Sequence, residues 1–236
     1  MNAMIKSDLI TMKNSAAQLA ITPVVVAIFI TAMTGSLIAG AAALTVMLPF
    51  LYIFSISAYD EMNGWERFRL TLPLTRHQVA YGRYASTLLV VAVCAVIALA
   101  FSAIAVPIMS AISPDGLWTG VFAETGAPDE NVMVLLASAI GVVMALLLVV
   151  AALSYPLIMR FGMTKGTRLA PIALILILAF GFWLVGDSGL LDGLGGIWDG
   201  LAASTALIGA VAVACALVLY VLSALLSARL YDKRQF

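Results

Sequence analysis

Six long runs of apolar residues, none with a charged side chain at its centre, constrain this chain more than any other feature of its sequence. A bilayer core about 30 Å thick is crossed by about 20 apolar residues, because an α-helix rises about 1.5 Å per residue. The runs are therefore predicted to be membrane-spanning helices. They cover residues 17–33, 37–58, 84–110, 132–159, 169–185 and 201–227.

The composition supports the same fold class. Of the 236 residues, 64% are hydrophobic and 10% are charged, whereas a soluble domain is about half apolar and about a quarter charged. Such a chain cannot cover its apolar surface with its own charges. The sequence predicts an all-α polytopic membrane protein with no soluble domain large enough to fold alone.

The basic residues alternate between the connections. All 12 lie at the termini or in every second connection. The intervening loops, near Thr34 and at 111–131 and 186–200, contain no Lys or Arg, and the two longer ones carry seven acidic residues. By the positive-inside rule the basic side is cytoplasmic, and six spans then place both termini there. The basic residues are Lys6, Lys13, Arg67, Arg69, Arg76, Arg83, Arg160, Lys165, Arg168, Arg229, Lys233 and Arg234.

Residues 1–16 have the pattern of an amphipathic helix. Apolar side chains recur at helical spacing, and Lys6 and Lys13 lie off that stripe. We expect this segment to lie on the cytoplasmic leaflet and residues 17–236 to form the six-span domain. A frayed basic tail is the alternative. The apolar stripe consists of Met1, Met4, Ile5, Leu9 and Met12.

The connection at residues 60–76 differs from the others in combining dense charge with Trp65 and Phe68. Pro73 would end any helix begun at Asp60, and Thr75 with Gln78 has the spacing of a capping box. Aromatic and Arg side chains are common anchors at protein interfaces. The segment therefore suits docking on another protein, although a solvated turn with its aromatics at the lipid headgroups fits equally well.

A family resemblance is centred on this segment. The acidic pair followed by an aromatic, the run 72–76, and Arg83 followed by Tyr84 resemble the bacterial permease subunits of type-two ATP-binding-cassette exporters. The resemblance implies that 60–76 is a coupling segment that seats in a groove of a separate ATPase subunit. The residues assigned to this contact are Asp60, Glu61, Trp65, Glu66, Arg67, Phe68, Arg69 and Pro73.

The same resemblance implies partners and a location. The chain would pair with a second membrane subunit, identical or different, and with ATPase subunits that bind ATP and Mg²⁺. It would be a multi-pass protein of the bacterial cytoplasmic membrane, in contact with lipid and with no nucleic-acid partner. The expected cargo is an amphipathic peptide first, and a lipid or small amphiphile second.

The chain itself is not predicted to be an enzyme. It has no G-x-x-x-x-G-K-[ST] loop, since Lys165 follows Thr164 where that motif requires Gly. His77, the only histidine, lies among basic residues and is expected at the surface. No catalytic residue, metal site or cofactor is therefore predicted within it.

Two other functions fit parts of the pattern. An ion-coupled secondary transporter usually has carboxylates at the membrane midplane, which the six runs lack. A non-transporting scaffold, or an immunity or receptor protein, fits the composition and is disfavoured only by the resemblance. For a transport pathway the polar candidates are Thr45, Ser55 and Ser57, although such hydroxyls often bond to their own helix backbone.

Overall fold

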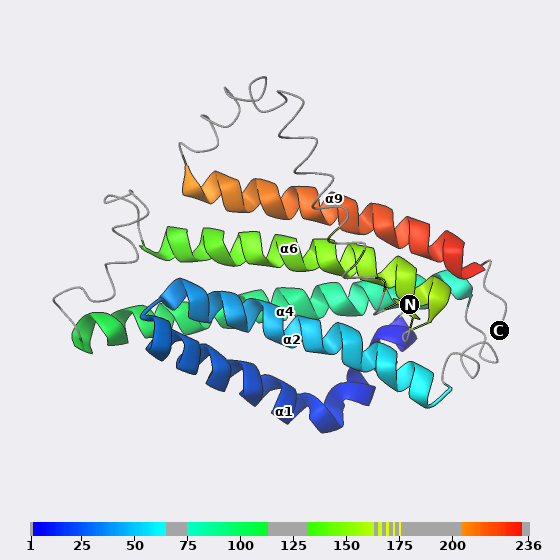
Figure 1. Cartoon of the computed structure of the whole chain (residues 1–236), viewed down its shortest axis with the longest axis horizontal. Helices are drawn as coiled ribbons and strands as arrows, with labels where there is room; N and C mark the ends of the chain where they lie inside the picture. The colour runs from blue at the N-terminus through cyan, green and yellow to red at the C-terminus, as the bar shows by residue number, and fades with distance from the viewer. Residues whose placement is uncertain are drawn as a thin grey trace, which may run out of the picture.

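The computed structural model describes residues 2–64, 75–112, 132–162, 165–166, 169, 172, 175 and 204–232. Within these residues five long helices run side by side (Figure 1). No strand occurs in the described ranges, so the all-α prediction is confirmed for them. The helices are α1 (Asn2–Thr34), α2 (Leu37–Met62), α4 (Arg76–Ile112), α6 (Val132–Phe161) and α9 (Thr205–Asp232).

Among the residues that the structure describes, four helices are long and apolar enough to cross a membrane. These spans are Leu37–Met62, His77–Ile108, Met133–Phe161 and Ala206–Leu230, and they match the predicted second, third, fourth and sixth runs. In α1 the described side chains form a shorter apolar stretch, Ile21–Thr34, and the predicted first run at 17–33 extends beyond it into residues whose side chains are not described. The predicted fifth span falls almost entirely outside the described residues, so the count of six stays a prediction.

The exposed surface of these spans supports a membrane location. Large apolar side chains cover their outward faces, including Val96, which is 65% exposed, and Leu146, which is 62% exposed. Contiguous apolar surface of this extent is rare on soluble monomers. In a bilayer the same side chains contact lipid, as the high hydropathy of the sequence predicts.

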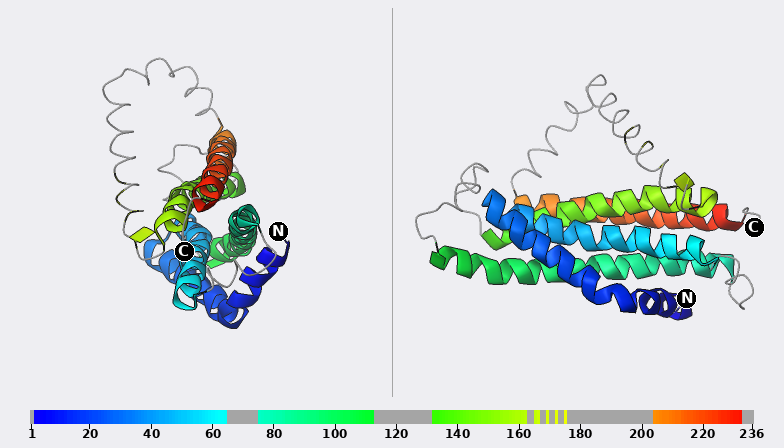
Figure 2. Two further views of the ribbon diagram at one scale, coloured as in Figure 1. Left: turned by 90° about the vertical axis from the view of Figure 1, so that its right-hand side faces the viewer. Right: turned by 60° about the horizontal axis from the view of Figure 1, so that its bottom comes forward.

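α1 differs from its prediction in one respect. Residues 1–16 were expected to form a separate interfacial helix, but α1 runs as one helix from Asn2 to Thr34. It changes direction between its first turns, dark blue in the figures, and the remainder (Figures 1 and 2). That residues 1–16 lie on the membrane surface stays a prediction.

The helix ends follow local chemistry. The Thr75 amide donates to Gln78 Oε1 and the Gln78 amide donates to Thr75 Oγ1, both at 3.3 Å, which confirms the capping box at the start of α4. Ser36 Oγ caps α2 by accepting from the Ala39 amide at 3.3 Å. After the end of α2, Gly64 has a φ of 63°, a conformation that favours glycine.

Close helix packing depends on small residues. A Cβ at Gly209 of α9 would lie 2.8 Å from the Ser138 Cα of α6, and one at Gly40 of α2 would lie 3.0 Å from the Ala27 carbonyl oxygen of α1. Both glycines therefore let neighbouring backbones approach. The main core fills the space between α4, α6 and α9 with Tyr84, Leu148, Tyr155 and Tyr220 among its buried side chains.

One end of the bundle gathers the start of α1, the end of α2, the start of α4 and the ends of α6 and α9 (Figures 1 and 2). Basic residues lie in the first or last three turns of the helices at this end, among them Lys6, Arg76, Arg83, Arg160 and Arg229. We call it the basic end. The side of the membrane on which the basic end lies stays a prediction.

Candidate functional site

A buried ion cluster lies at the basic end, centred on Arg83 in the third turn of α4. The Arg83 residue is only 5% exposed. Its Nη2 donates to Asp60 Oδ2 from the last turn of α2, and its Nε lies 3.6 Å from Asp8 Oδ2 of α1. A buried guanidinium requires such partners, because the charge has lost its hydration. The cluster joins three helices.

Ser86 holds Asp8 from the same face of α4, one helical turn after Arg83. Its Oγ is 3.1 Å from Asp8 Oδ2 and 2.9 Å from the Arg83 carbonyl oxygen. Tyr52 of α2 is also buried beside this cluster, with its side chain next to Ser86. Asp8 is 0% exposed, so the first turns of α1 are packed against α4 at this point.

A chain of hydroxyls extends from the next residue, Tyr84, toward α9. Its hydroxyl lies 2.8 Å from Ser223 Oγ and 2.7 Å from Ser227 Oγ. Ser223 Oγ donates to the Ala152 carbonyl of α6. Each of these hydroxyl protons has an acceptor if Ser227 donates to Tyr84, Tyr84 donates to Ser223, and Ser223 donates to the Ala152 carbonyl. Tyr220 adds a 3.0 Å bond from its hydroxyl to the Tyr84 carbonyl.

Thr87 of α4 connects α6 to the backbone of Arg83. The Thr87 hydroxyl donates to the Arg83 carbonyl oxygen at 3.0 Å and also contacts the Tyr155 hydroxyl of α6. With the Thr87 proton used in the first bond, Tyr155 donates to Thr87. The Tyr84 ring packs against those of Tyr155 and Tyr220, with centroids 4.9 and 4.8 Å away. Arg83 and Tyr84 thus link all five helices.

These contacts fix the relative positions of the helices at the basic end. Among the described residues no group of three or more His, Cys, Asp or Glu side chains could hold a metal ion. The guanidinium contacts two carboxylates only when α1, α2 and α4 are in one relative arrangement. Buried polar pairs of this kind serve best as devices that specify packing.

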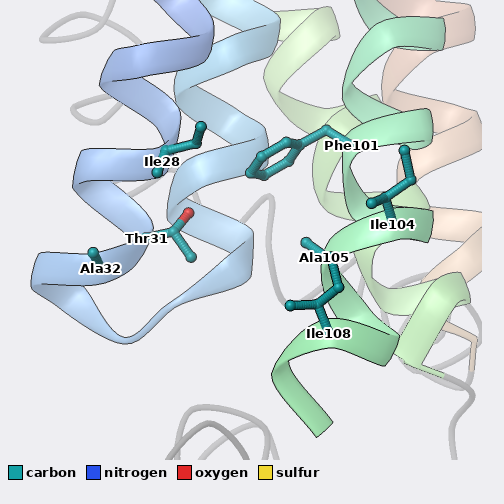
Figure 3. A pocket seen from close by; sticks show the side chains of 7 residues that line it. All are labelled: Ile28, Thr31, Ala32, Phe101, Ile104, Ala105 and Ile108. Atoms are coloured by element: carbon teal, nitrogen blue, oxygen red, sulfur yellow. The ribbon is translucent and has the colours of Figure 1, made fainter. Parts of the chain in front are cut away.

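A cavity of about 490 Å³ lies toward the opposite end, between α1 and α4 (Figure 3). The Thr31 hydroxyl donates to the Ala27 carbonyl oxygen of its own helix at 2.8 Å, so the wall presents an apolar surface. The cavity has no contact with the ion cluster. Its lining residues are Ile28, Thr31, Ala32, Phe101, Ile104, Ala105 and Ile108.

Sequence comparison settles the family. Residues 3–232 match the model of a family described as ABC-2 family transporter protein. The chain belongs to the ABC-2 family. No curated protein and no solved structure matches it. Membership makes the chain a transmembrane subunit of an ABC transporter and implies partnership with an ABC ATPase subunit.

The predicted ATPase contact of this ABC-2 subunit is only partly within the described residues. Asp60 was assigned to the docking surface, but it is 7% exposed and paired with Arg83, so it is a buried internal contact. Glu61 is exposed in the last turn of α2. The residues that lie outside the described ranges are Trp65, Glu66, Arg67, Phe68, Arg69 and Pro73.

None of the predicted pathway residues lines the cavity between α1 and α4. Thr45 and Ser57 are buried and donate to the carbonyl oxygens of Ala41 and Ile53 in their own helix, each at 2.8 Å. Ser55 is half-buried. Their role in a pathway stays a prediction. His77 is exposed, as expected.

Sequence reasoning missed Asp8 and treated Arg83 as a residue outside the membrane run. Both had a signal. Asp8 lies four residues after Met4 and three after Ile5, on the apolar stripe of the first segment, where a carboxylate needs a partner. Arg83 continues the buried face of α4 that Val79 and Ala80 begin. A charge on an apolar face is the pattern that would have indicated an internal pair.

Proposed function

We propose that this ABC-2 subunit works in an ATP-driven exporter of the bacterial cytoplasmic membrane. The observation that carries the proposal is the family match over residues 3–232. ATP and Mg²⁺ bind on the separate ATPase subunit, and a second membrane subunit, identical or different, completes the complex. The basic end and both termini face the cytoplasm.

The segment 60–76 transmits the motion of the ATPase. Glu61, Met62 and Asn63 are exposed at the end of α2, directly before the charged and aromatic stretch. Asp60 contributes from inside, since its pair with Arg83 fixes the end of the helix to the bundle. Trp65 and Phe68 supply the anchors of the contact, with Glu66, Arg67 and Arg69 giving it charge complementarity.

The cargo is an amphipathic molecule, first an amphipathic peptide and second a lipid or small amphiphile. The resemblance to bacterial exporters supports this class. The apolar walls of the cavity between α1 and α4 are compatible with its apolar part. ATP-dependent uptake of a fluorescent amphipathic peptide or of a fluorescent phospholipid into inverted vesicles, whose cytoplasmic face points outward, separates the two cargo classes.

Replacement of Trp65 by Ala tests the coupling contact. Loss of an interface aromatic costs about 2 kcal/mol or more, so the affinity for the ATPase subunit should fall about thirtyfold. ATPase copurification, ATP-dependent efflux and the level of the chain in the membrane are measured together. Glu61→Lys should also weaken docking if the facing ATPase surface is basic.

Trp118→Ala is the matched control, because Trp118 belongs to a connection predicted on the other side of the membrane. It should leave ATPase copurification unchanged. If Trp65→Ala inserts normally and keeps both ATPase binding and efflux, the coupling role of 60–76 is excluded. A non-transporting scaffold then becomes the better interpretation.

A further inference from the structure

Arg83 is the point at which two regions distant in sequence meet. Asp8 belongs to the first turns of α1 and Asp60 to the last turn of α2, and both carboxylates contact the same guanidinium. All three residues are at most 7% exposed. Neither contact is local, so each restrains the position of one helix relative to another.

The first turns of α1 are attached to α4 by directional contacts. Asp8 Oδ2 accepts from Ser86 Oγ at 3.1 Å in addition to facing Arg83 Nε. An amphipathic segment that rested only on lipid would keep its carboxylate in water. Here the carboxylate points into the bundle, and in both figures the dark-blue turns lie beside the start of α4 (Figures 1 and 2).

The end of α2 is restrained by the same side chain. Beyond Asp60 the helix continues only to Met62, and Glu61, Met62, Asn63 and Gly64 are all exposed. The Asp60 pair with Arg83 is therefore the last buried ionic contact of this helix among the described residues. A guanidinium suits this bridging role, because its planar fork donates in several fixed directions.

We infer that Arg83 is a positioning residue through which the first turns of α1 hold the end of α2 in place. Asp8 fixes the orientation of the guanidinium, and the guanidinium fixes Asp60. The part of this inference that concerns ATPase binding rests on the proposed function. The part that concerns the position of α2 rests on the contacts of Arg83 alone.

Amide hydrogen exchange of the full chain in lipid nanodiscs tests the structural half. Asp8→Asn removes a charge from α1 and should raise exchange in the peptide that covers the end of α2, although residue 8 lies in another helix. Ser102→Ala is the matched control, since Ser102 is a buried α4 hydroxyl bonded only to Ala98 O of its own helix at 2.9 Å. It should leave that peptide unchanged.

A second, milder variant keeps the inference testable if the Asp8→Asn protein does not fold. Ser86→Ala removes the hydroxyl that holds Asp8 but keeps all three charges, and it should give a smaller increase in exchange at the same peptide. If neither variant changes exchange at the end of α2, Arg83 does not transmit the position of α1 and the inference is wrong.

A double-mutant cycle with the ATPase subunit tests the functional half. Asp8→Asn should lower ATPase affinity, and its combination with Trp65→Ala should deviate from additivity by about threefold or more, because both act on one contact. A loss from Trp65→Ala with no loss from Asp8→Asn overturns the positioning role. Raised exchange with neither variant affecting ATPase affinity upholds the link within the chain and rejects the proposed coupling function.

Discussion

The two ends of the bundle use their polar groups in different ways. At the basic end, Arg83, Tyr84 and Ser223 bond to groups on other helices. Toward the opposite end, the described hydroxyls of Thr31 and Ser102 bond to carbonyl oxygens of their own helices. The basic end is thus held by directional contacts and the other end by apolar packing.

This difference indicates which parts can move. Directional contacts are lost when helices shift by an ångström or two, whereas apolar surfaces that face lipid or a cavity can slide with little change in free energy. The cavity between α1 and α4 lies in the apolar half. We expect the helices to move together at the basic end and to separate at the other.

The largest effect should come from Arg83→Met. This change leaves the Asp8 and Asp60 carboxylates without their shared cation in a buried site, which costs about 3–5 kcal/mol. The apparent melting temperature of the purified chain in detergent should fall strongly. Arg83→Lys should recover only part of the loss, because an ammonium group lacks the guanidinium fork.

Arg229→Met is the control for this change, since Arg229 is an exposed residue in the last turn of α9. Its cost should stay below about 1 kcal/mol. Equal losses of stability from Arg83→Met and Arg229→Met would mean that the buried cluster stabilises the basic end no more than an exposed charge at a helix terminus does.

A smaller effect is expected from Tyr84→Phe. The ring contacts with Tyr155 and Tyr220 remain, but the hydroxyl between Ser223 and Ser227 is lost, at a cost of about 1–3 kcal/mol. Ser102→Ala, which breaks a bond within one helix, should cost less. Thermal unfolding of both variants compares the two ends directly. A larger loss of stability from Ser102→Ala than from Tyr84→Phe would mean that the basic end is not the one held by directional contacts.

Features set by neighbouring residues were predictable from the sequence. The Thr75 and Gln78 capping box depends on three residues of spacing, and it occurs as expected. The four spans depend on the length and apolarity of single segments. The predicted third span began at Tyr84 because Arg83 was taken as a membrane boundary, whereas α4 begins at Arg76 and buries Arg83.

The ion cluster was not predictable in the same way. Asp60 was assigned to a docking surface because the family resemblance implies that 60–76 is a coupling segment. Its environment is instead decided by α1 and α4, which are distant in sequence. Helical periodicity alone places Asp60 on the face of Ile53 and Ile56, both 1% exposed. Its partner could be identified only when the packing of three helices was known.

Cross-linking from the two ends of the bundle tests whether the ATPase subunit binds at the basic end. In a background with Cys94→Ala and Cys215→Ala, a single Asn63→Cys at the exposed end of α2 or a single Ser113→Cys just after α4 carries a photoactivatable thiol cross-linker in membranes of the source cells. Mass spectrometry then identifies each adduct. If the ATPase subunit binds at the basic end, Asn63→Cys gives an adduct with an ABC ATPase and Ser113→Cys gives none. An ATPase adduct from Ser113→Cys alone, or from neither position, would contradict binding at that end.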